Sequence, residues 1–561
     1  MKIGVYLGFD PYTRLTTEGL GRYIGGLIKG FTDKGDIVKL AIPEWLEDSV
    51  IELCEEFDID RNQLELNIMH RLPFIWGIYS FLYKKKKPKK QGIGLKTRIK
   101  YASQSLTEKS MDVLVTSSNM MLFIALLLLM CIGGIACAAL CVMLAAVVFV
   151  ILIGMGLIMA IPLLVIAIVF KKKDLIKRKS KKIYELIAEF VGLLKGTKRF
   201  ILQYKRSIYL KMLSETRKLL AKESNKMDVD VWFISTLFWP ETNKLTKPRV
   251  NVVPDVVSQV YSYDFAGLDG TADTIKLCRE TIDGGKYFIT YCNYINESVL
   301  KKTFYKYNGV SIPHVNNALD RWLELDKSFS QKLNIKYDLS KKYAYKLLRT
   351  LPLGRLATPE SYGNFSFDNI RYIFYPSQVR PYKNITNLIK AHRELIVHYN
   401  EDIKLVLTCN PVNLKEDAKE FIRINKMEHD IMFFTGVSIQ HLAALYKCAE
   451  LVVNPTLYEG GFLFTFGEGM SVGTPSIMGD IPQTTDVLKD YESIMQNAVF
   501  DPYSVDDMAM KIKWGLDNRE KLYEYELPLY NKLAERTSEI VADDYVAYFK
   551  KVVELETACA G

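Results

Sequence analysis

The chain is poor in cysteine, and its cysteines follow no pattern that builds a site. Its 561 residues include nine cysteines, none of them in a Cys-x-x-Cys pair. An odd, unpatterned set of this kind argues against a disulfide framework and against a zinc site. A reducing compartment is the simplest interpretation. The first ten residues are too short and too soon interrupted for a secretory signal, and they predict a first strand instead.

The chain also lacks the charge excess of a disordered polyelectrolyte. Charged residues make up 25% of it and the formal net charge is +10, values that are typical of globular proteins. At about 150 residues per domain, its length predicts two or more domains. Much of the positive charge lies in two lysine-rich runs, at 84–90 and 171–182. Such runs can bind nucleic acid, but these two flank a hydrophobic block, so nucleic acid is the weakest interpretation.

The segment 121–170 is a long run without polar residues, because it has no charged residue and no Ser, Thr, Asn or Gln. A membrane-spanning helix takes about 20 residues, so this block has room for two and predicts an inserted two-helix hairpin. The lysine-rich flanks favour the cytoplasmic side and the anionic headgroups of the bilayer. The chain is therefore expected at a membrane, with both lobes on the cytoplasmic side. The turn near 141–147 has no polar residue, so a re-entrant hairpin stays an alternative to a transmembrane one.

From residue 371 onward, short apolar runs alternate with amphipathic helical segments. Strands are expected at 371–375, 403–408, 431–434 and 451–454, with helices at 384–398, 414–423 and 439–448. This alternation is typical of βαβ units, which form a parallel sheet with right-handed crossovers. Ligands of such sheets bind at the carboxyl ends of the strands, so the loops after these strands are the candidate binding segments.

A second set of strands predicts an N-terminal lobe that the hydrophobic block interrupts. These strands are expected at 3–7, 38–42, 64–69, 229–235 and 250–253. The fold class is therefore α/β, with two Rossmann-like lobes and an inserted transmembrane or re-entrant hairpin. The predicted divisions are 1–71 and 227–365 for the N-terminal lobe, 72–226 for the membrane insertion, 366–520 for the C-terminal lobe and 521–561 for a helical tail.

The segment Asn454–Pro475, which follows an apolar strand, is the most informative part of the chain. It carries Glu459, a Gly460-Gly461 turn and Glu468, with a helix start expected near 467–471. Glycines let backbone amides approach a ligand, and a helix N-terminus favours negative charge, so the loop suits a phosphate-bearing ligand. The carboxylates accept hydrogen bonds from paired sugar hydroxyls. Two surface glutamates around an ordinary turn are the alternative.

Three other loops have matching chemistry. Arg380 and Lys383 lie between a predicted strand and a helix, where two cations can neutralise a diphosphate leaving group. Gly436 follows the strand expected at 431–434. Gly19 and Gly21 form a Gly-x-Gly turn between the first strand and a helix, an arrangement that can hold a phosphate. Solvated loop cations and ordinary turns are the alternatives at these positions.

Together these segments resemble the family four retaining glycosyltransferases, the glycosyl transferases group 1, which have the GT-B fold. The resemblance rests on Glu468 with Gly473-Thr474-Pro475, on Arg380–Asn384, and on Gly19–Tyr23. The spacing between the two glutamates is one residue longer than the family pattern. Family members often have a histidine near the transferred sugar where this chain has Pro254, so no catalytic histidine is expected.

The resemblance implies a retaining, metal-independent hexosyltransferase whose donor is a nucleotide-diphosphate sugar. It assigns the ribose hydroxyls to Glu468 and the diphosphate to Arg380 and Lys383. The donor sugar is expected to meet Glu459 and the amides of Gly460, Gly461 and Phe462, with Gly436, Gly19 and Gly21 completing the donor-binding set. No metal ligand and no cofactor besides the donor substrate are expected. Asp228-x-Asp230 opens a strand and is not expected to bind a metal.

A membrane hairpin beside the acceptor lobe favours a glycan or polyprenyl-linked acceptor, as in polysaccharide or glycoconjugate synthesis. The alternative is a catalytically inactive GT-B-like scaffold of a membrane glycan-assembly complex. The longer glutamate spacing and the missing histidine support that alternative. His314 follows a predicted strand and is expected to be a packed or loop histidine.

Overall fold

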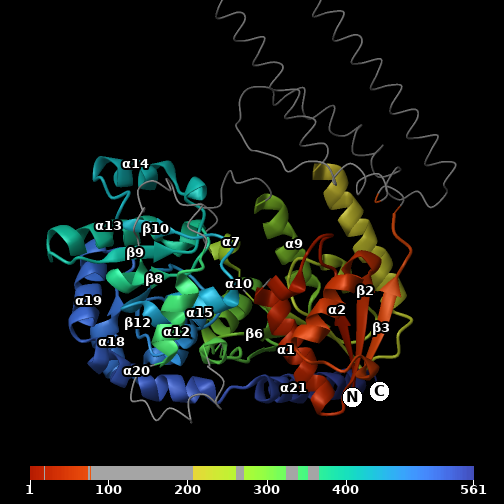
Figure 1. The fold of residues 1–561 in the computed structure, drawn as a ribbon. Helices are drawn as coiled ribbons and strands as arrows, with labels where there is room; N and C mark the ends of the chain where they lie inside the picture. The colour runs from red at the N-terminus through yellow and green to blue at the C-terminus, as the bar shows by residue number, and fades with distance from the viewer. Residues whose placement is uncertain are drawn as a thin grey trace, which may run out of the picture. The chain divides into compact units, whose positions relative to one another are not determined.

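The computed structural model describes residues 1–17, 19–73, 76, 206–254, 256–260, 271–316, 318–323, 339–351 and 366–560. The chain divides into two compact units, Met1–Ile68 with Ser224–Gly561, and Met69–Glu223. The first unit holds two parallel sheets with helices around them (Figure 1). No helix in the described ranges is both long and apolar enough to cross a membrane. The predicted hairpin at 121–170 lies outside these ranges.

The N-terminal lobe is built on a seven-stranded sheet in the order β3-β2-β1-β4-β5-β6-β7. Its strands are β1 (Lys2–Tyr6), β2 (Ile37–Pro43), β3 (Leu64–Met69), β4 (Val231–Ile234), β5 (Arg249–Val253), β6 (Tyr287–Thr290) and β7 (Gly309–Ser311). Neighbouring strands from β2 to β7 run parallel. The strand order reverses between β1 and β4, which is the point where doubly wound sheets bind ligands.

Helices cover this sheet because their apolar residues recur on one face. In α1, Ile24, Leu27, Ile28 and Phe31 are at most 1% exposed, and their spacing forms a single stripe toward the core. The helices of the lobe are α1 (Gly19–Asp33), α2 (Glu47–Glu56), α7 (Val257–Val260), α9 (Thr271–Gly284), the π-helix η5 (Ile295–Lys301) and α10 (Lys302–Phe304).

The C-terminal lobe has a six-stranded sheet in the order β10-β9-β8-β11-β12-β13. Its strands are β8 (Tyr372–Tyr375), β9 (Lys404–Leu407), β10 (Ile431–Phe433), β11 (Leu451–Asn454), β12 (Ser476–Gly479) and β13 (Val499–Phe500). All neighbouring pairs are parallel, and the order reverses between β8 and β11. The prediction of an α/β fold with two Rossmann-like lobes is confirmed.

The helices expected at 384–398, 414–423 and 439–448 are present in this lobe as α13, α14 and α15, and some other helices were not predicted. The helices of the lobe are α12 (Leu339–Leu348), α13 (Ile385–Val397), α14 (Glu416–Ile424), α15 (Ile439–Cys448), α16 (Phe464–Ser471), α17 (Pro482–Leu488), α18 (Glu492–Ala498) and α19 (Val505–Asp517). The start expected near 467–471 is wrong, because α16 begins at Phe464. Its glycines allow close packing instead, since a Cβ on Gly469 would lie 2.9 Å from the carbonyl oxygen of Thr474.

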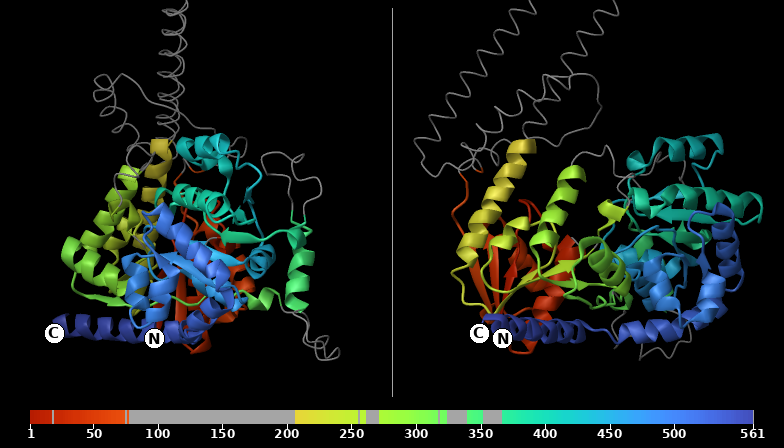
Figure 2. Two further views of the ribbon diagram at one scale, coloured as in Figure 1. Left: turned by 90° about the vertical axis from the view of Figure 1, so that its left-hand side faces the viewer. Right: turned by 180° about the vertical axis from the view of Figure 1, so that it is seen from behind.

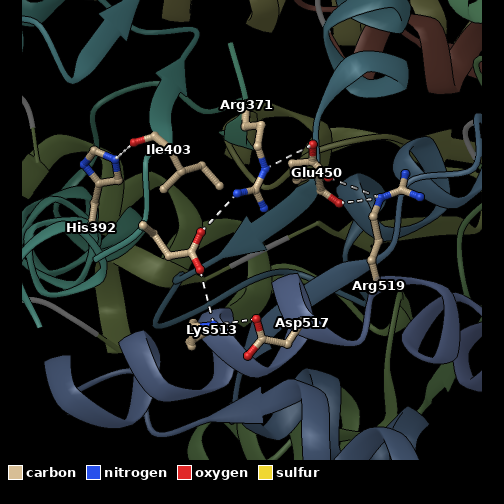
Figure 3. Close-up of polar contacts among 8 residues, drawn as sticks. Arg371, His392, Ile403, Glu450, Lys513, Asp517 and Arg519 are labelled. Carbon is tan, nitrogen blue, oxygen red and sulfur yellow. Dashed lines mark hydrogen bonds and ion pairs between the residues drawn. The ribbon is translucent and has the colours of Figure 1, made fainter. Parts of the chain in front are cut away.

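The amino-terminal edge of the C-terminal sheet carries a network of ion pairs (Figure 3). Arg371, directly before β8, contacts Glu401 at 3.1 Å and Glu450 at 3.7 Å. On α19, Lys513 contacts Glu401 at 3.2 Å. Arg519, the first residue of the helix after α19, reaches Glu450 at 3.9 Å. This network ties the C-terminal helices to the strand starts. The carboxyl ends of the same strands lie at the opposite edge, which leaves that edge to the candidate binding loops.

Two helices end the chain and contact both lobes. The first, α20 (Arg519–Ala534), packs on α16 and α18, and the second, α21 (Ser538–Ala560), packs along α1 (Figures 1 and 2). The hydroxyl groups of Tyr23 and Tyr545 lie 2.9 Å apart. A Cβ on Gly30 would lie 2.5 Å from the Cβ of Ala542, so α1 and α21 approach closely. The helical tail therefore packs across both lobes, as the sequence indicates.

Candidate donor-binding site

Two loops meet at the switch point of the C-terminal sheet. Strands β8 and β11 are direct neighbours, with Ile373 opposite Leu451, so the loops that follow them lie side by side. The backbone amide of Leu457 in the second loop donates to the carbonyl of Tyr382 in the first at 2.8 Å. The two loops are thus bonded to each other at the edge where ligands of such sheets bind.

Asn384 fixes this junction. It is buried, and its φ of 54° places it in the left-handed region, which asparagine tolerates better than most residues. Its side-chain amide donates to the carbonyl of Pro455 at 3.0 Å and to that of Pro502 at 2.6 Å. The asparagine was visible in the sequence as the end of the Arg380–Asn384 motif, but the motif alone gave it no role. The structure shows that it holds three loops together.

The junction brings Lys383 and Glu459 into contact. The ammonium group of Lys383 donates to Oε1 of Glu459, and the two side chains are 20% and 25% exposed. Arg380 is exposed in the same loop, and its guanidinium donates to Oε1 of Gln378 at 3.2 Å. Burial, with the nearby Glu459 carboxylate, raises the pKa of Tyr375 above its usual value. The three residues predicted to be catalytic, Arg380 and Lys383 for the diphosphate and Glu459 for the sugar, therefore lie on two bonded loops.

The segment after Glu459, which we name the glycine loop (residues 459–463), presents unpaired amides. Gly461, Phe462 and Leu463 are buried. Within the described part of the chain the backbone amides of Gly460, Gly461, Phe462, Leu463 and Phe464 donate no hydrogen bond. Leaving a buried amide unpaired costs about 1–3 kcal/mol, so native chains rarely do it. A run of such amides at a strand end is suited to an anionic or hydroxyl-rich ligand.

Glu468 lies in the middle of α16 and has a fixed orientation. The hydroxyl of Tyr446, on α15, donates to its Oε2. Tyr446 is fully buried, and burial together with the Glu468 carboxylate raises its pKa well above the usual value. Gly436 follows β10 with a φ of +67°, and a Cβ there would meet nothing within 4 Å. Its surroundings leave room for a planar group to approach the backbone.

The two N-terminal glycines lie at the carboxyl edge of the other sheet. Gly19 opens α1, and a Cβ on it would meet nothing within 4 Å. Gly21, by contrast, has no room for a side chain, because a Cβ there would lie 2.2 Å from the carbonyl oxygen of Leu15. The structure therefore explains Gly21 by close packing, while Gly19 keeps an open backbone. Asp228 and Asp230, by contrast, both bind Lys2, through its ammonium group and its backbone amide respectively.

Residues of the N-terminal lobe that sequence reasoning did not assign to the site also contact the glycine loop. Nε2 of His314, just after β7, lies 2.7 Å from the carbonyl oxygen of Phe462. The thiol of Cys292, just after β6, points at the carbonyl oxygen of Gly460 at 3.7 Å. Their places at strand ends were the available signal, and nothing in the sequence specified these partners.

Comparisons with known proteins agree with this geometry. Residues 363–536 match the family model described as Glycosyl transferases group 1. One curated relative is the MMP alpha-(1->4)-mannosyltransferase of Mycolicibacterium hassiacum, which is 28% identical over 197 residues. The match takes in 34% of this chain and 45% of that protein, so the chain spans less than half the length of this relative.

Two solved structures share the fold over nearly the whole chain. A glycosyltransferase from Rickettsia africae has a TM-score of 0.50 at 11% identity, covering 98% of each chain. The N-terminal domain of trehalose-6-phosphate phosphatase from Candida albicans has a TM-score of 0.50 at 10% identity, covering 98% of this chain and 96% of that one. At such identities the likeness shows the fold, which is a GT-B arrangement of two parallel-sheet α/β lobes.

Proposed function

We propose that this chain is a membrane-associated, retaining glycosyltransferase that uses a nucleotide-diphosphate sugar. One observation carries the proposal, namely the run of unpaired amides in the glycine loop directly after Glu459, whose carboxylate pairs with Lys383 of the Arg380–Asn384 loop. Diphosphate is the leaving group of such donors, and cations stabilise the charge that develops on it. The unpaired amides suit the hydroxyl groups of the donor sugar, which accept hydrogen bonds. The group 1 match over residues 363–536 covers these elements.

Each candidate residue then has a role in holding the donor. Glu468, oriented by Tyr446, accepts hydrogen bonds from the ribose hydroxyls. Gly436 lets the nucleotide base lie against the backbone. Arg380 and Lys383 bind the diphosphate, while Glu459 and the glycine-loop amides meet the sugar. Gly19 and Gly21 bring the start of α1 toward the donor phosphates.

The proposed reaction is a front-face substitution. The bond between the anomeric carbon and the diphosphate oxygen breaks, and its electron pair stays with the diphosphate. The acceptor oxygen bonds to the same face of that carbon, and its proton passes to a donor phosphate oxygen. This route needs no protein base, which agrees with Pro254 in place of a histidine. The α-linkage in the relative's name is the one expected from an α-linked donor under retention. A β-linked product from an α-linked donor would exclude this mechanism.

We also propose that the transfer is independent of metal ions. The side chains present already supply positive charge at the diphosphate position, through Lys383 and Arg380. Full turnover after extensive treatment with EDTA is the expected result. Restoration of a lost activity by Mg²⁺ or Mn²⁺ would contradict it.

The acceptor is proposed to be a glycan or a polyprenyl-linked glycan at the cytoplasmic face of a membrane. The support is the uncharged segment 121–170 between two lysine-rich runs. The full chain should float with vesicles that contain anionic lipid, and a chain lacking 121–170 should stay behind. Equal activity of the two on a water-soluble acceptor would favour a soluble acceptor and an enzyme that is merely anchored.

The decisive experiment compares the detergent-purified wild type with Glu468→Ala. Each is incubated with UDP-, GDP- and dTDP-sugars, mannose donors included, plus a membrane lipid extract, and nucleotide release is followed. Release from one donor, lost in the variant, would support the transferase and identify the donor. Intact protein that neither releases nor binds any nucleotide in calorimetry would contradict the proposal.

A catalytically inactive scaffold is the second candidate. The observation in its favour is that Glu459 already pairs with Lys383, so the cation is balanced within the protein. A scaffold would bind a nucleotide sugar in calorimetry without turnover, even with the lipid extract present. A transferase releases nucleotide under the same conditions, so the two candidates give different outcomes.

A further inference from the structure

The N-terminal lobe holds two carbonyl groups of the glycine loop. Cys292 approaches the carbonyl oxygen of Gly460 at 3.7 Å, and His314 binds that of Phe462 at 2.7 Å. These contacts join residues that are 168 and 148 positions apart in the chain. The position of the glycine loop is therefore set by the C-terminal lobe and also by two strand ends of the N-terminal lobe.

Fixing a carbonyl also fixes the amide on the other side of the same peptide bond. A trans peptide is planar, and its C=O and N–H point in opposite directions. The hydrogen bond from His314 to Phe462 therefore orients the N–H of Leu463, and the Cys292 contact orients that of Gly461. Both amides belong to the set that donates no hydrogen bond among the described residues. The two contacts thus determine where the proposed donor-binding amides point.

His314 is itself held firmly in place. Its ring stacks on Phe464 with the centroids 3.8 Å apart and meets Tyr291 edge-on at 5.9 Å. The loop fits closely against the same two residues, because a Cβ on Gly461 would lie 2.8 Å from Cβ of Tyr291 and 3.2 Å from Cδ2 of His314. Glycine is therefore required at 461 by this packing.

We propose that His314 is a positioning residue of the transfer reaction, which aims the glycine-loop amides at the donor by binding the Phe462 carbonyl. The inference rests on the transferase function proposed above. His314 touches the loop through a protein carbonyl, so its role is to orient the loop and not to take part in proton transfer. Nδ1 of His314 lies 3.1 Å from the carbonyl oxygen of Val315, and Nε2 makes the shorter contact, 2.7 Å, with that of Phe462. A neutral imidazole has one N–H, and the shorter contact assigns it to Nε2. Burial lowers the pKa of the ring.

The same segment continues this contact along α16. A Cβ on Gly467 would lie 1.8 Å from Oδ1 of Asn316, and the amide of Leu319 donates to the Ser471 hydroxyl at 2.9 Å. The described residues after β7 thus contact α16 at Gly467 and at its last residue, Ser471. His314 reaches the glycine loop itself.

The test compares His314→Gln, His314→Asn and His314→Leu. A glutamine amide can reach the position of Nε2 and donate to Phe462, an asparagine amide is too short, and leucine has no donor. We expect kcat to fall about 10- to 100-fold in the Leu and Asn variants, because a reoriented glycine loop displaces the donor sugar from its reactive position, with most activity kept in the Gln variant. The Kd for the free nucleoside diphosphate should change less than about threefold, because the Glu468 contact to ribose remains. His398→Gln, at an exposed histidine after α13, is the matched control.

The outcomes separate this inference from the function on which it rests. Wild-type turnover with equal kcat in all three His314 variants would overturn the positioning role and leave the transferase intact. Equal loss in folded Gln and Asn variants would overturn the hydrogen bond as its cause. A wild type that neither binds nor turns over any donor would remove the function and the inference together. Should the Leu variant fail to fold, the comparison of Gln with Asn decides.

Discussion

Lys383 and Glu459 form an ion pair across the two loops that meet at the β8–β11 switch point. Each belongs to a different sequence motif, and 76 positions separate them. Without a ligand, Glu459 balances the positive charge of Lys383 in the partly buried, proposed diphosphate site. A bound diphosphate would then compete with Glu459 for the same ammonium group.

Replacing Lys383 with alanine tests the cation directly. We expect turnover to fall about 100-fold or more, because a preorganised positive charge at the leaving group is lost. The free energy of unfolding should change by less than about 1 kcal/mol, since partly exposed ion pairs contribute little. Steady-state kinetics and urea denaturation measure the two effects, with Lys489→Ala at an exposed lysine after α17 as the control. Wild-type turnover in the Lys383 variant would remove this residue from the site.

Replacing Glu459 with glutamine separates the sugar contact from the ion pair. We expect turnover to fall, because a carboxylate facing the donor sugar is lost. We also expect the free nucleoside diphosphate to bind more tightly, because Lys383 no longer pairs with a competing carboxylate. Calorimetry with the nucleoside diphosphate and kinetics with the intact donor give the two numbers. Weaker nucleotide binding would show that Glu459 supports the diphosphate site and does not compete with it.

The hydrogen bond from Tyr446 to Glu468 predicts a non-additive pair of variants. Glu468→Gln should weaken nucleotide binding about tenfold through the lost charged acceptor for ribose. Tyr446→Phe keeps the buried ring and frees the carboxylate to rotate, so we expect a smaller loss of about threefold. If Tyr446 acts only through Glu468, the double variant should match Glu468→Gln alone. Additive losses in calorimetry would show that Tyr446 has an independent role.

Local patterns along the sequence were sufficient for the fold and for much of the candidate site. The alternation of buried strands and amphipathic helices predicted most strands of both sheets, because parallel strands covered on two faces are almost wholly apolar. Strands β6, β12 and β13 were not predicted. Strand β3 and helix α15 begin and end where the sequence indicated, at Leu64–Met69 and Ile439–Cys448. The short spacing from a strand end to a helix start also placed Arg380 and Lys383 at the carboxyl edge.

Contacts between segments far apart in the chain could not be read in the same way. The bond from His314 to Phe462 depends on the approach of the β7 end to the glycine loop, which no local pattern records. Tyr446 looks like an ordinary buried aromatic of α15 until α16 brings Glu468 beside its hydroxyl. The early start of α16 was missed for a related reason. The low helix propensity of its glycines predicts a turn, but Gly467 and Gly469 are helical because they pack closely against Asn316 and Thr474.

His392 predicts a pH dependence of stability that is unrelated to the donor. Its ring is fully buried on α13, Nε2 bonds the carbonyl of Ile403 at 2.9 Å (Figure 3), and Nδ1 has no partner among the described residues. Burial lowers its pKa to about 4, whereas the unfolded value is about 6.5. Between about pH 6.5 and about pH 4 the histidine is protonated in the unfolded chain and neutral in the folded chain. The free energy of unfolding therefore falls as the pH drops from about 6.5 to about 4.

The size of this effect follows from the shift, which amounts to about 3 kcal/mol at most across that window. His392→Gln keeps a side-chain amide that can donate to Ile403 and removes the titrating group. We therefore expect the free energy of unfolding of the wild type to fall more steeply between pH 7 and pH 5 than that of the variant. Urea denaturation of both proteins at several pH values measures the difference, with His398→Gln at an exposed histidine as the control. Parallel profiles for the wild type and His392→Gln would mean that the buried ring accepts its proton without cost, which its unpartnered Nδ1 argues against.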